Sequence, residues 1–96
     1  MERVINNLNT VETVDNMSVE LVAEKIKGEK RREIMDSVIS NKEHMESKNK
    51  YHPTSLPFLF SEWHRHFPNI KQSIGCIGCR KAVVKFWTKV YNYWEE

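Results

Sequence analysis

The sequence predicts an all-α fold, a small helical domain in which charged N-terminal helices pack on a C-terminal aromatic helix-loop-helix. Two observations lead to this fold class. Apolar residues recur at spacings of three and four in successive segments, which is the period of an amphipathic helix, and no segment has the pattern of a sheet. Gly28, Pro53 and Pro68 fall at the ends of these segments, where a helix is expected to stop.

The two halves of the chain differ in composition. All ten aromatic residues, all three prolines and both cysteines lie in residues 51–96, whereas residues 1–50 hold nineteen of the twenty-eight charged residues. The first half has a net charge of −1 and the second of +3. We interpret residues 1–16 as a polar N-terminal arm and residues 17–96 as one helical domain, with a charged half (17–50) and an aromatic core half (51–96).

The N-terminal half supports two helices. The arm, with its scattered Val, Ile and Leu, is typical of a flexible segment or of one that orders on a partner. Ser18 is a suitable cap for a short helix that carries Val19, Val22 and Ile26 and is interrupted at Gly28. A second helix is expected over about 29–47, with one apolar stripe and a heavily charged back. Residues 47–55 are expected to form a loop, because Pro53 disfavours helical geometry at the residue before it.

The third expected helix begins after Ser55, which we interpret as its cap, has Pro57 in its first turn and ends near His66 before Pro68. Its apolar face consists of Leu56, Leu59, Phe60, Trp63 and Phe67. At about 100° per residue, His64 and His66 fall on opposite borders of that face, about 160° apart. Residues 69–73 form a connector.

The last helix, expected over about 76–94, has two adjacent apolar rows. One row is Cys79, Val83, Phe86, Val90 and Tyr93, and the other is Val84, Trp87, Tyr91 and Trp94. Together the rows cover about 200° of the helix, roughly twice the stripe of an ordinary surface helix. This helix must therefore contact two neighbours, the third helix on one row and the second helix on the other. If a row stays uncovered, Trp87, Tyr91 and Trp94 become candidate partner-binding residues.

The Cys76-x-x-Cys79 motif is the main candidate site, and zinc is one cofactor that it could hold. Two cysteines at this spacing can place both sulfurs about 2.3 Å from one ion, with histidines as further ligands. The candidate ligands are Cys76, Cys79, His64 and His66, although both histidines reach one ion only if the third helix ends before His66. With one histidine, a fourth ligand must come from His52, His44, Glu62 or water.

Two other interpretations of the cysteine pair stay open. In a redox module, Cys76 at the helix start would be the activated thiolate and Cys79 the resolving thiol, but the βαβ context that usually carries such a motif is missing. In a purely structural role, Cys79 is a small core residue beside Val83 and Phe86, and Cys76 is a loop thiol.

Nucleic-acid binding is the alternative for the basic residues. Arg65, Lys71, Arg80, Lys81, Lys85 and Lys89, with His64 and His66, could form a basic surface, and Trp63 or Tyr91 could stack on bases. A row of lysines opposite an apolar face is, however, what any solvated amphipathic helix presents. The overall charge of +2 is too small to indicate nucleic acid by itself.

These observations favour a small non-enzymatic interaction or assembly protein, with a protein partner or a second copy of the chain. The sequence has no Ser-His-Asp spacing and no paired carboxylates in the aromatic half apart from Glu62 and the terminal pair. It has neither the apolar stretch of a signal peptide nor about 18 consecutive apolar residues, so we expect no membrane span and a cytoplasmic location. The abundance of Asn, Ile and Lys suits small phage proteins, which would place it in the virion or the host cytoplasm.

Overall fold

The computed structural model describes residues 16–96, and this part of the chain forms four helices and no strand. The helices are α1 (Asn16–Lys25), α2 (Gly28–Lys48), α3 (Ser55–His66) and α4 (Ile77–Glu95). The all-α fold class is confirmed, and α2, α3 and α4 lie within one residue of their expected limits. The first helix begins earlier than expected, because Ser18, which was expected to cap it, is its third residue. The arm expected over residues 1–16 falls outside the described residues, apart from Asn16, which begins α1.

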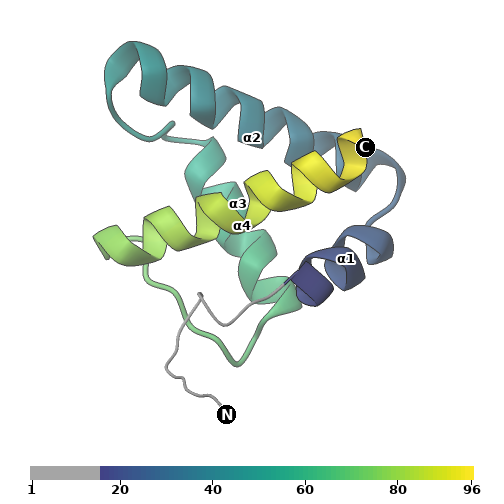
Figure 1. The fold of residues 1–96 in the computed structure, drawn as a ribbon. Helices are drawn as coiled ribbons and strands as arrows, with labels where there is room; N and C mark the ends of the chain where they lie inside the picture. Colours follow the sequence, from purple (N-terminus) through teal and green to yellow (C-terminus); the bar gives the residue numbers. More distant parts are fainter. Residues whose placement is uncertain (1–15) are drawn as a thin grey trace.

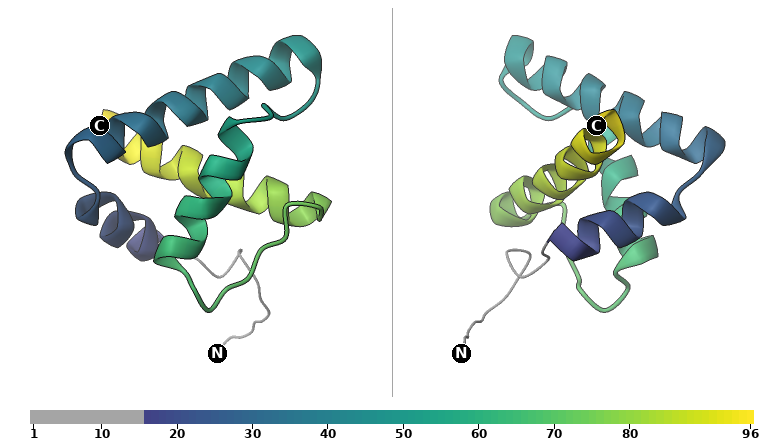
Figure 2. Two further views of the ribbon diagram at one scale, coloured as in Figure 1. Left: turned by 180° about the vertical axis from the view of Figure 1, so that it is seen from behind. Right: turned by 45° about the vertical axis from the view of Figure 1, so that its right-hand side comes forward.

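The four helices are arranged around α4. In Figure 1, α2 and α4 run side by side in opposite directions, and α3 crosses behind α4. The views of Figure 2 show α1 against the C-terminal part of α4. Because α4 packs against all three other helices, it is the central element of the fold.

The core lies mainly between α3 and α4. Trp63 of α3 and Trp87 of α4 are completely buried, and the ring of Phe86 meets both of them edge-on, at centroid distances of 5.3 and 5.0 Å. The indole Nε1 of Trp87 donates a hydrogen bond to the carbonyl oxygen of Leu59 (3.0 Å), so this ring is fully buried without an unpaired donor. The aromatic residues at helical spacing therefore form the core that their pattern predicts.

The end of α4 has a neighbour that the sequence did not indicate. The hydroxyl of Tyr93 donates to Glu24 Oε2 (2.7 Å), and Trp94 Nε1 donates to the carbonyl oxygen of Ala23 (3.0 Å). Both acceptors belong to α1, which also buries Val19, Val22 and Ala23. The wide apolar surface of α4 is thus shared among three helices, where two were expected.

The chain enters α2 and α3 through two specific conformations. Gly28 has a φ of +55°, in the left-handed region that glycine adopts without steric cost, and it turns the chain from α1 into α2. At α3, His52 Nδ1 accepts the backbone N–H groups of Thr54 (3.2 Å) and Ser55 (3.1 Å). The expectation that Ser55 caps this helix was wrong, because Ser55 is its first residue and an imidazole binds the free N–H groups.

A buried carboxylate connects α2 to α3. Glu62 is 2% exposed, and its Oε2 accepts a hydrogen bond from Lys30 Nζ (3.0 Å). Arg65 Nε lies 3.6 Å from Glu62 Oε1. The hydrogen bond to Glu62 raises the pKa of Lys30 above its usual range. Because breaking a buried pair leaves a charge without compensation, this contact favours one packing of α2 on α3.

Replacing Trp87 by phenylalanine tests the importance of the buried indole. We expect Trp87→Phe to lower the free energy of unfolding by about 1–3 kcal/mol, because the variant loses the buried hydrogen bond to the Leu59 carbonyl and leaves space where the larger indole packed. The matched control is Trp94→Phe, which removes the hydrogen bond to Ala23 at a half-buried position and should cost less. Urea denaturation followed by circular dichroism measures both, and equal losses would contradict the central position of Trp87.

Candidate functional site

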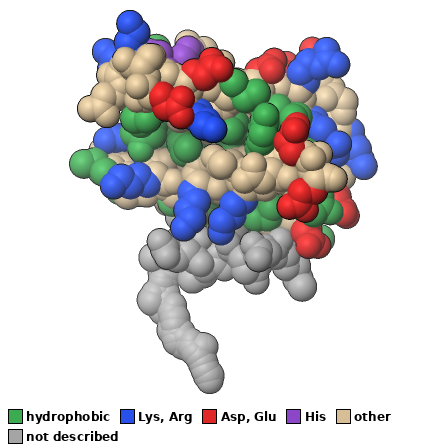
Figure 3. All heavy atoms as spheres, turned by 45° about the horizontal axis from the view of Figure 1, so that its top comes forward, with side chains coloured by type: hydrophobic (Ala, Val, Ile, Leu, Met, Phe, Trp, Pro, Cys, Tyr) green, Lys and Arg blue, Asp and Glu red, His purple; other side chains and the backbone are tan. Residues whose placement is uncertain are grey.

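An open groove runs between α2 and α4. It has a volume of about 820 Å³ and is lined by side chains of these two helices and by Tyr51 just after α2. Its apolar lining consists of Val38, Ile39, Met45, Tyr51, Val84 and Tyr91. In Figure 3 hydrophobic side chains are visible at the surface between charged ones on the face that includes α2. The groove is therefore an apolar depression bordered by charge.

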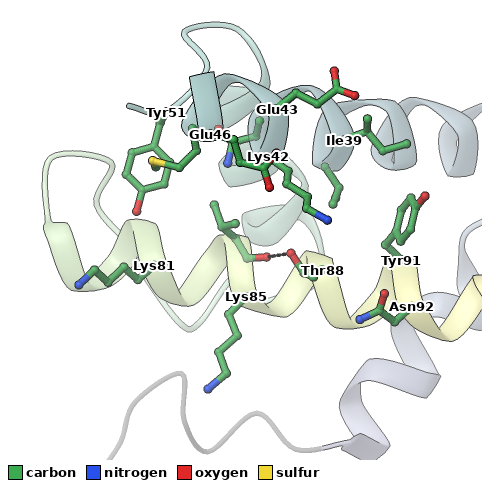
Figure 4. A pocket seen from close by; sticks show the side chains of 14 residues that line it. Ile39, Lys42, Glu43, Glu46, Tyr51, Lys81, Lys85, Thr88, Tyr91 and Asn92 are labelled. Carbon is green, nitrogen blue, oxygen red and sulfur yellow. Dashed lines mark hydrogen bonds between the residues drawn. The ribbon is translucent and has the colours of Figure 1, made fainter. Parts of the chain in front are cut away.

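Two polar side chains on the groove wall bond within the protein. Asn41 is buried, and its Oδ1 accepts the backbone N–H of His52 (2.9 Å). The hydroxyl of Thr88 donates to the carbonyl oxygen of Val84 (2.8 Å), as drawn in Figure 4. Because these groups already bond within the chain, the wall of the groove is less polar than its residue types suggest.

The charged residues around the groove are arranged unequally. Lys81 and Lys85 project from the outer side of α4, and Lys42 extends from α2 toward α4 (Figure 4). Glu43 points away from the groove in the same view. The only acidic residue of α4 is Glu95, at its last position. On the α4 side the polar lining is Lys81, Lys85, Thr88 and Asn92, with no acidic side chain, whereas Glu46 lines the α2 side.

The groove ends near the start of α4. Arg80 places its guanidinium 5.6 Å from the ring centroid of Tyr51 and donates a hydrogen bond from Nη1 to the carbonyl oxygen of Ile74 (2.7 Å). Arg80 thus ties the loop before α4 to the residue that follows α2, and its charge is engaged within the protein.

The three expected partner-binding residues have different positions. Tyr91 is half-buried and rises from α4 toward Ile39 of α2 in the groove (Figure 4). Trp87 is 0% exposed and packs in the core, so its assignment to a partner surface was wrong. Trp94 is half-buried, donates to Ala23 and lies 4.9 Å from the guanidinium of Arg31, so it joins α1 and α2 to α4.

The structure does not assemble the expected zinc ligands. Within residues 16–96 no group of three or more His, Cys, Asp or Glu side chains is placed to hold a metal ion. His64 Nε2 accepts the backbone N–H of Gln72 (3.0 Å), and the ring of His66 packs edge-on against Trp87 at 6.0 Å. His52 caps α3, and His44 packs against His52 with a centroid distance of 5.1 Å. Each candidate histidine therefore has a structural contact of its own.

The cysteine pair forms the first turn of α4. Cys76 is the N-cap residue, and its Sγ accepts the backbone N–H of Cys79 (3.3 Å). Cys76 is exposed and Cys79 half-buried. The hydrogen bond from the Cys79 thiol, with backbone N–H groups, lowers the pKa of Cys76, and the same contact raises the pKa of Cys79. The two sulfurs are thus chemically unequal.

The candidate nucleic-acid residues are partly engaged within the protein. Arg80 is held by Tyr51 and Ile74, and Arg65 lies beside Glu62. Lys71 is exposed in the loop before α4, and Lys81, Lys85 and Lys89 are exposed along α4. Trp63 is completely buried, so the suggestion that it stacks on bases was wrong.

Sequence reasoning missed two features of this region. The groove was anticipated only as an uncovered row on α4, and its α2 wall, with the 37%-exposed Ile39, was not identified. The wide apolar surface of α4 was the available signal. The capping role of His52 had no sequence signal, because histidine is not among the preferred N-cap residues.

Comparisons with known proteins give no relative from which a function can be transferred. No protein-family model matches the chain, and neither the curated proteins nor the solved structures contain a significant match. Among the described residues, no helix is long and apolar enough to cross a membrane.

The position of His66 makes stability depend on pH. Burial lowers the pKa of His66, with Lys25 and Arg65 adding to this effect and Glu62 opposing it. The unfolded chain therefore binds a proton at His66 more readily than the folded chain. Burial of the neutral His66 ring therefore contributes fully to stability above about pH 6.5, the ordinary pKa of histidine. The contribution is lost as the pH falls through the lower pKa of the folded protein.

His66→Phe tests this contribution, because it keeps an aromatic ring beside Trp87 and removes the titrating group. We expect the free energy of unfolding of the wild type to fall more steeply between about pH 7 and 5 than that of the variant. Urea denaturation at several pH values measures the difference. Parallel pH profiles would contradict the assignment.

Proposed function

We propose that this protein is an interaction module that binds an amphipathic helix of a partner protein in the groove between α2 and α4. The observation that carries the proposal is the open depression of about 820 Å³ lined by apolar side chains of both helices. A helix binds in such a groove through apolar residues at i, i+3 or i+4 and i+7, which enter it from one face. The half-buried Tyr91 and the exposed Ile39 supply apolar contact area in the groove.

Charge selects the chemistry of the partner helix. Lys81 and Lys85 border the groove on the α4 side, and Lys42 reaches toward it from α2. A bound helix with acidic residues along the flank that faces α4 would meet these lysines at the rim. Charges at an interface rim contribute mainly to orientation, specificity and association rate, so the acidic flank would fix the direction of the bound helix.

Two synthetic helical peptides test the proposal by fluorescence anisotropy. Both carry leucines at helical spacing on one face; the first has glutamates along one flank and the second has lysines there. We expect the acidic peptide to bind at least tenfold more tightly, a difference of about 1.4 kcal/mol. The preference should shrink with added salt.

Matched variants locate the binding surface. Ile39→Glu places a charge in the groove at a 37%-exposed position, and Leu21→Glu makes the same change at a 57%-exposed position of α1 outside it. Ile39→Glu should weaken binding of the acidic peptide at least tenfold, which is about 1.4 kcal/mol, while Leu21→Glu leaves it unchanged.

Four outcomes would contradict the proposal. Equal binding of the two peptides would show that the groove does not prefer an acidic partner. No binding of either peptide would show that the groove does not bind a helix. Salt-sensitive binding of a single-stranded oligonucleotide, lost on substitution of Lys81 and Lys85, would favour the nucleic-acid alternative. A dimer in light scattering that Ile39→Glu dissociates would show that a second copy of the chain fills the groove.

A further inference from the structure

The turn that begins α4 exposes a thiol beside a second, more protected thiol. The backbone N–H of Cys76 donates to the carbonyl oxygen of Ser73 (3.0 Å), and Cys76 Sγ accepts the N–H of Cys79 (3.3 Å). These contacts hold the Cys76 sulfur at the surface over the first turn of the helix. The pair lies outside the lining of the α2–α4 groove, so the proposed helix binding leaves it unexplained.

The two thiols have the inequality that thiol–disulfide exchange requires. The more exposed Cys76 accepts hydrogen bonds and has the lowered pKa, whereas the half-buried Cys79 has the raised pKa. Cys76 is therefore suited to attack a disulfide and Cys79 to resolve the product.

Their positions also allow the two cysteines to form a disulfide with each other. Residues three apart at a helix start have Cα atoms about 5 Å apart, from the rise and radius of the helix. That separation lies within the range of about 4.4–6.8 Å found for disulfides. The backbone separation therefore permits a disulfide between Cys76 and Cys79.

Exposed apolar side chains flank the thiol pair. Ile74 is 43% exposed and Ile77 is 63% exposed, and they stand two residues before and one residue after Cys76. Isolated isoleucines at a surface are ordinary, but two of them next to a reactive thiol provide contacts for a polypeptide on either side of its disulfide. This arrangement favours a peptide disulfide over a small polar one.

We propose that Cys76 and Cys79 form a dithiol that reduces disulfides in apolar polypeptide segments. The Cys76 thiolate attacks one sulfur of the substrate disulfide, forms a mixed disulfide and releases the other substrate sulfur as a thiolate. Cys79 then loses its proton to solvent and attacks the Cys76 sulfur, which forms the Cys76–Cys79 disulfide and releases the second substrate thiolate. The protein pair loses two electrons, and the substrate disulfide gains them.

The first test uses the reduced full-length chain with oxidised glutathione as the probe, followed by acid quenching and intact-mass measurement. We expect the wild type to lose two hydrogen atoms with only a transient glutathione adduct. Cys79→Ser should retain the adduct on Cys76. Cys76→Ser should react at least about tenfold more slowly than Cys79→Ser, while the serine oxygen preserves the helix cap.

The second test examines the flanking isoleucines. The double variant Ile74→Ser and Ile77→Ser should react with oxidised glutathione at the wild-type rate but at least fivefold more slowly with a disulfide-linked peptide that has leucines beside its cysteines. Circular dichroism shows whether each variant is folded.

Several results would overturn the proposal. A stable glutathione adduct on the wild type would show that Cys79 does not resolve the mixed disulfide. Equal reaction rates of Cys76→Ser and Cys79→Ser would remove the distinct roles of the two thiols. If the isoleucine double variant lost the same fraction of its rate with oxidised glutathione and with the leucine-containing peptide, the isoleucines would not select an apolar substrate. All these readouts are independent of peptide binding in the groove.

Discussion

The large apolar surface of α4 is the constraint on which the rest of the structure depends. A helix with two adjacent apolar rows cannot be buried against one neighbour, because a single contact covers only a limited part of its circumference. Here α3 covers Phe86 and Trp87, one from each row, α1 covers the end with Tyr93 and Trp94, and α2 approaches the remaining side. The loops between the helices must therefore place α1, α2 and α3 against α4.

The groove follows from the same constraint. Val38 on α2 is buried, whereas Val84 and Tyr91 on α4 are only half-buried, so α2 covers this side of α4 incompletely. The remaining apolar surface is bordered by Lys81 and Lys85, which project into solvent from the outer side of α4. The solvent-exposed face of α4 must be charged, and the same lysines set the charge at the rim of the groove.

Much of the fold followed from the sequence, because helix period and breakers are local signals. The four helices and the buried Trp63, Phe86 and Trp87 lie where spacing placed them. The tertiary contacts could not be predicted from the sequence. The docking of α1 on Trp94 and Tyr93, the histidine cap of α3 and the separate engagement of His64 and His66 each depend on which segments meet in space. The zinc hypothesis rested on sequence spacing alone, which says nothing about the contacts that each histidine makes in the fold.

Native-state hydrogen exchange tests most directly whether α4 is the element that holds the fold together. The account predicts that the backbone amides of Val83, Phe86 and Val90 exchange only through global unfolding, with an opening free energy equal to the free energy of unfolding from urea denaturation. Amides of α1, which covers only one end of α4, should exchange through a smaller opening. If α4 exchanges at a lower free energy than α3, the helices do not depend on α4, and the account is wrong.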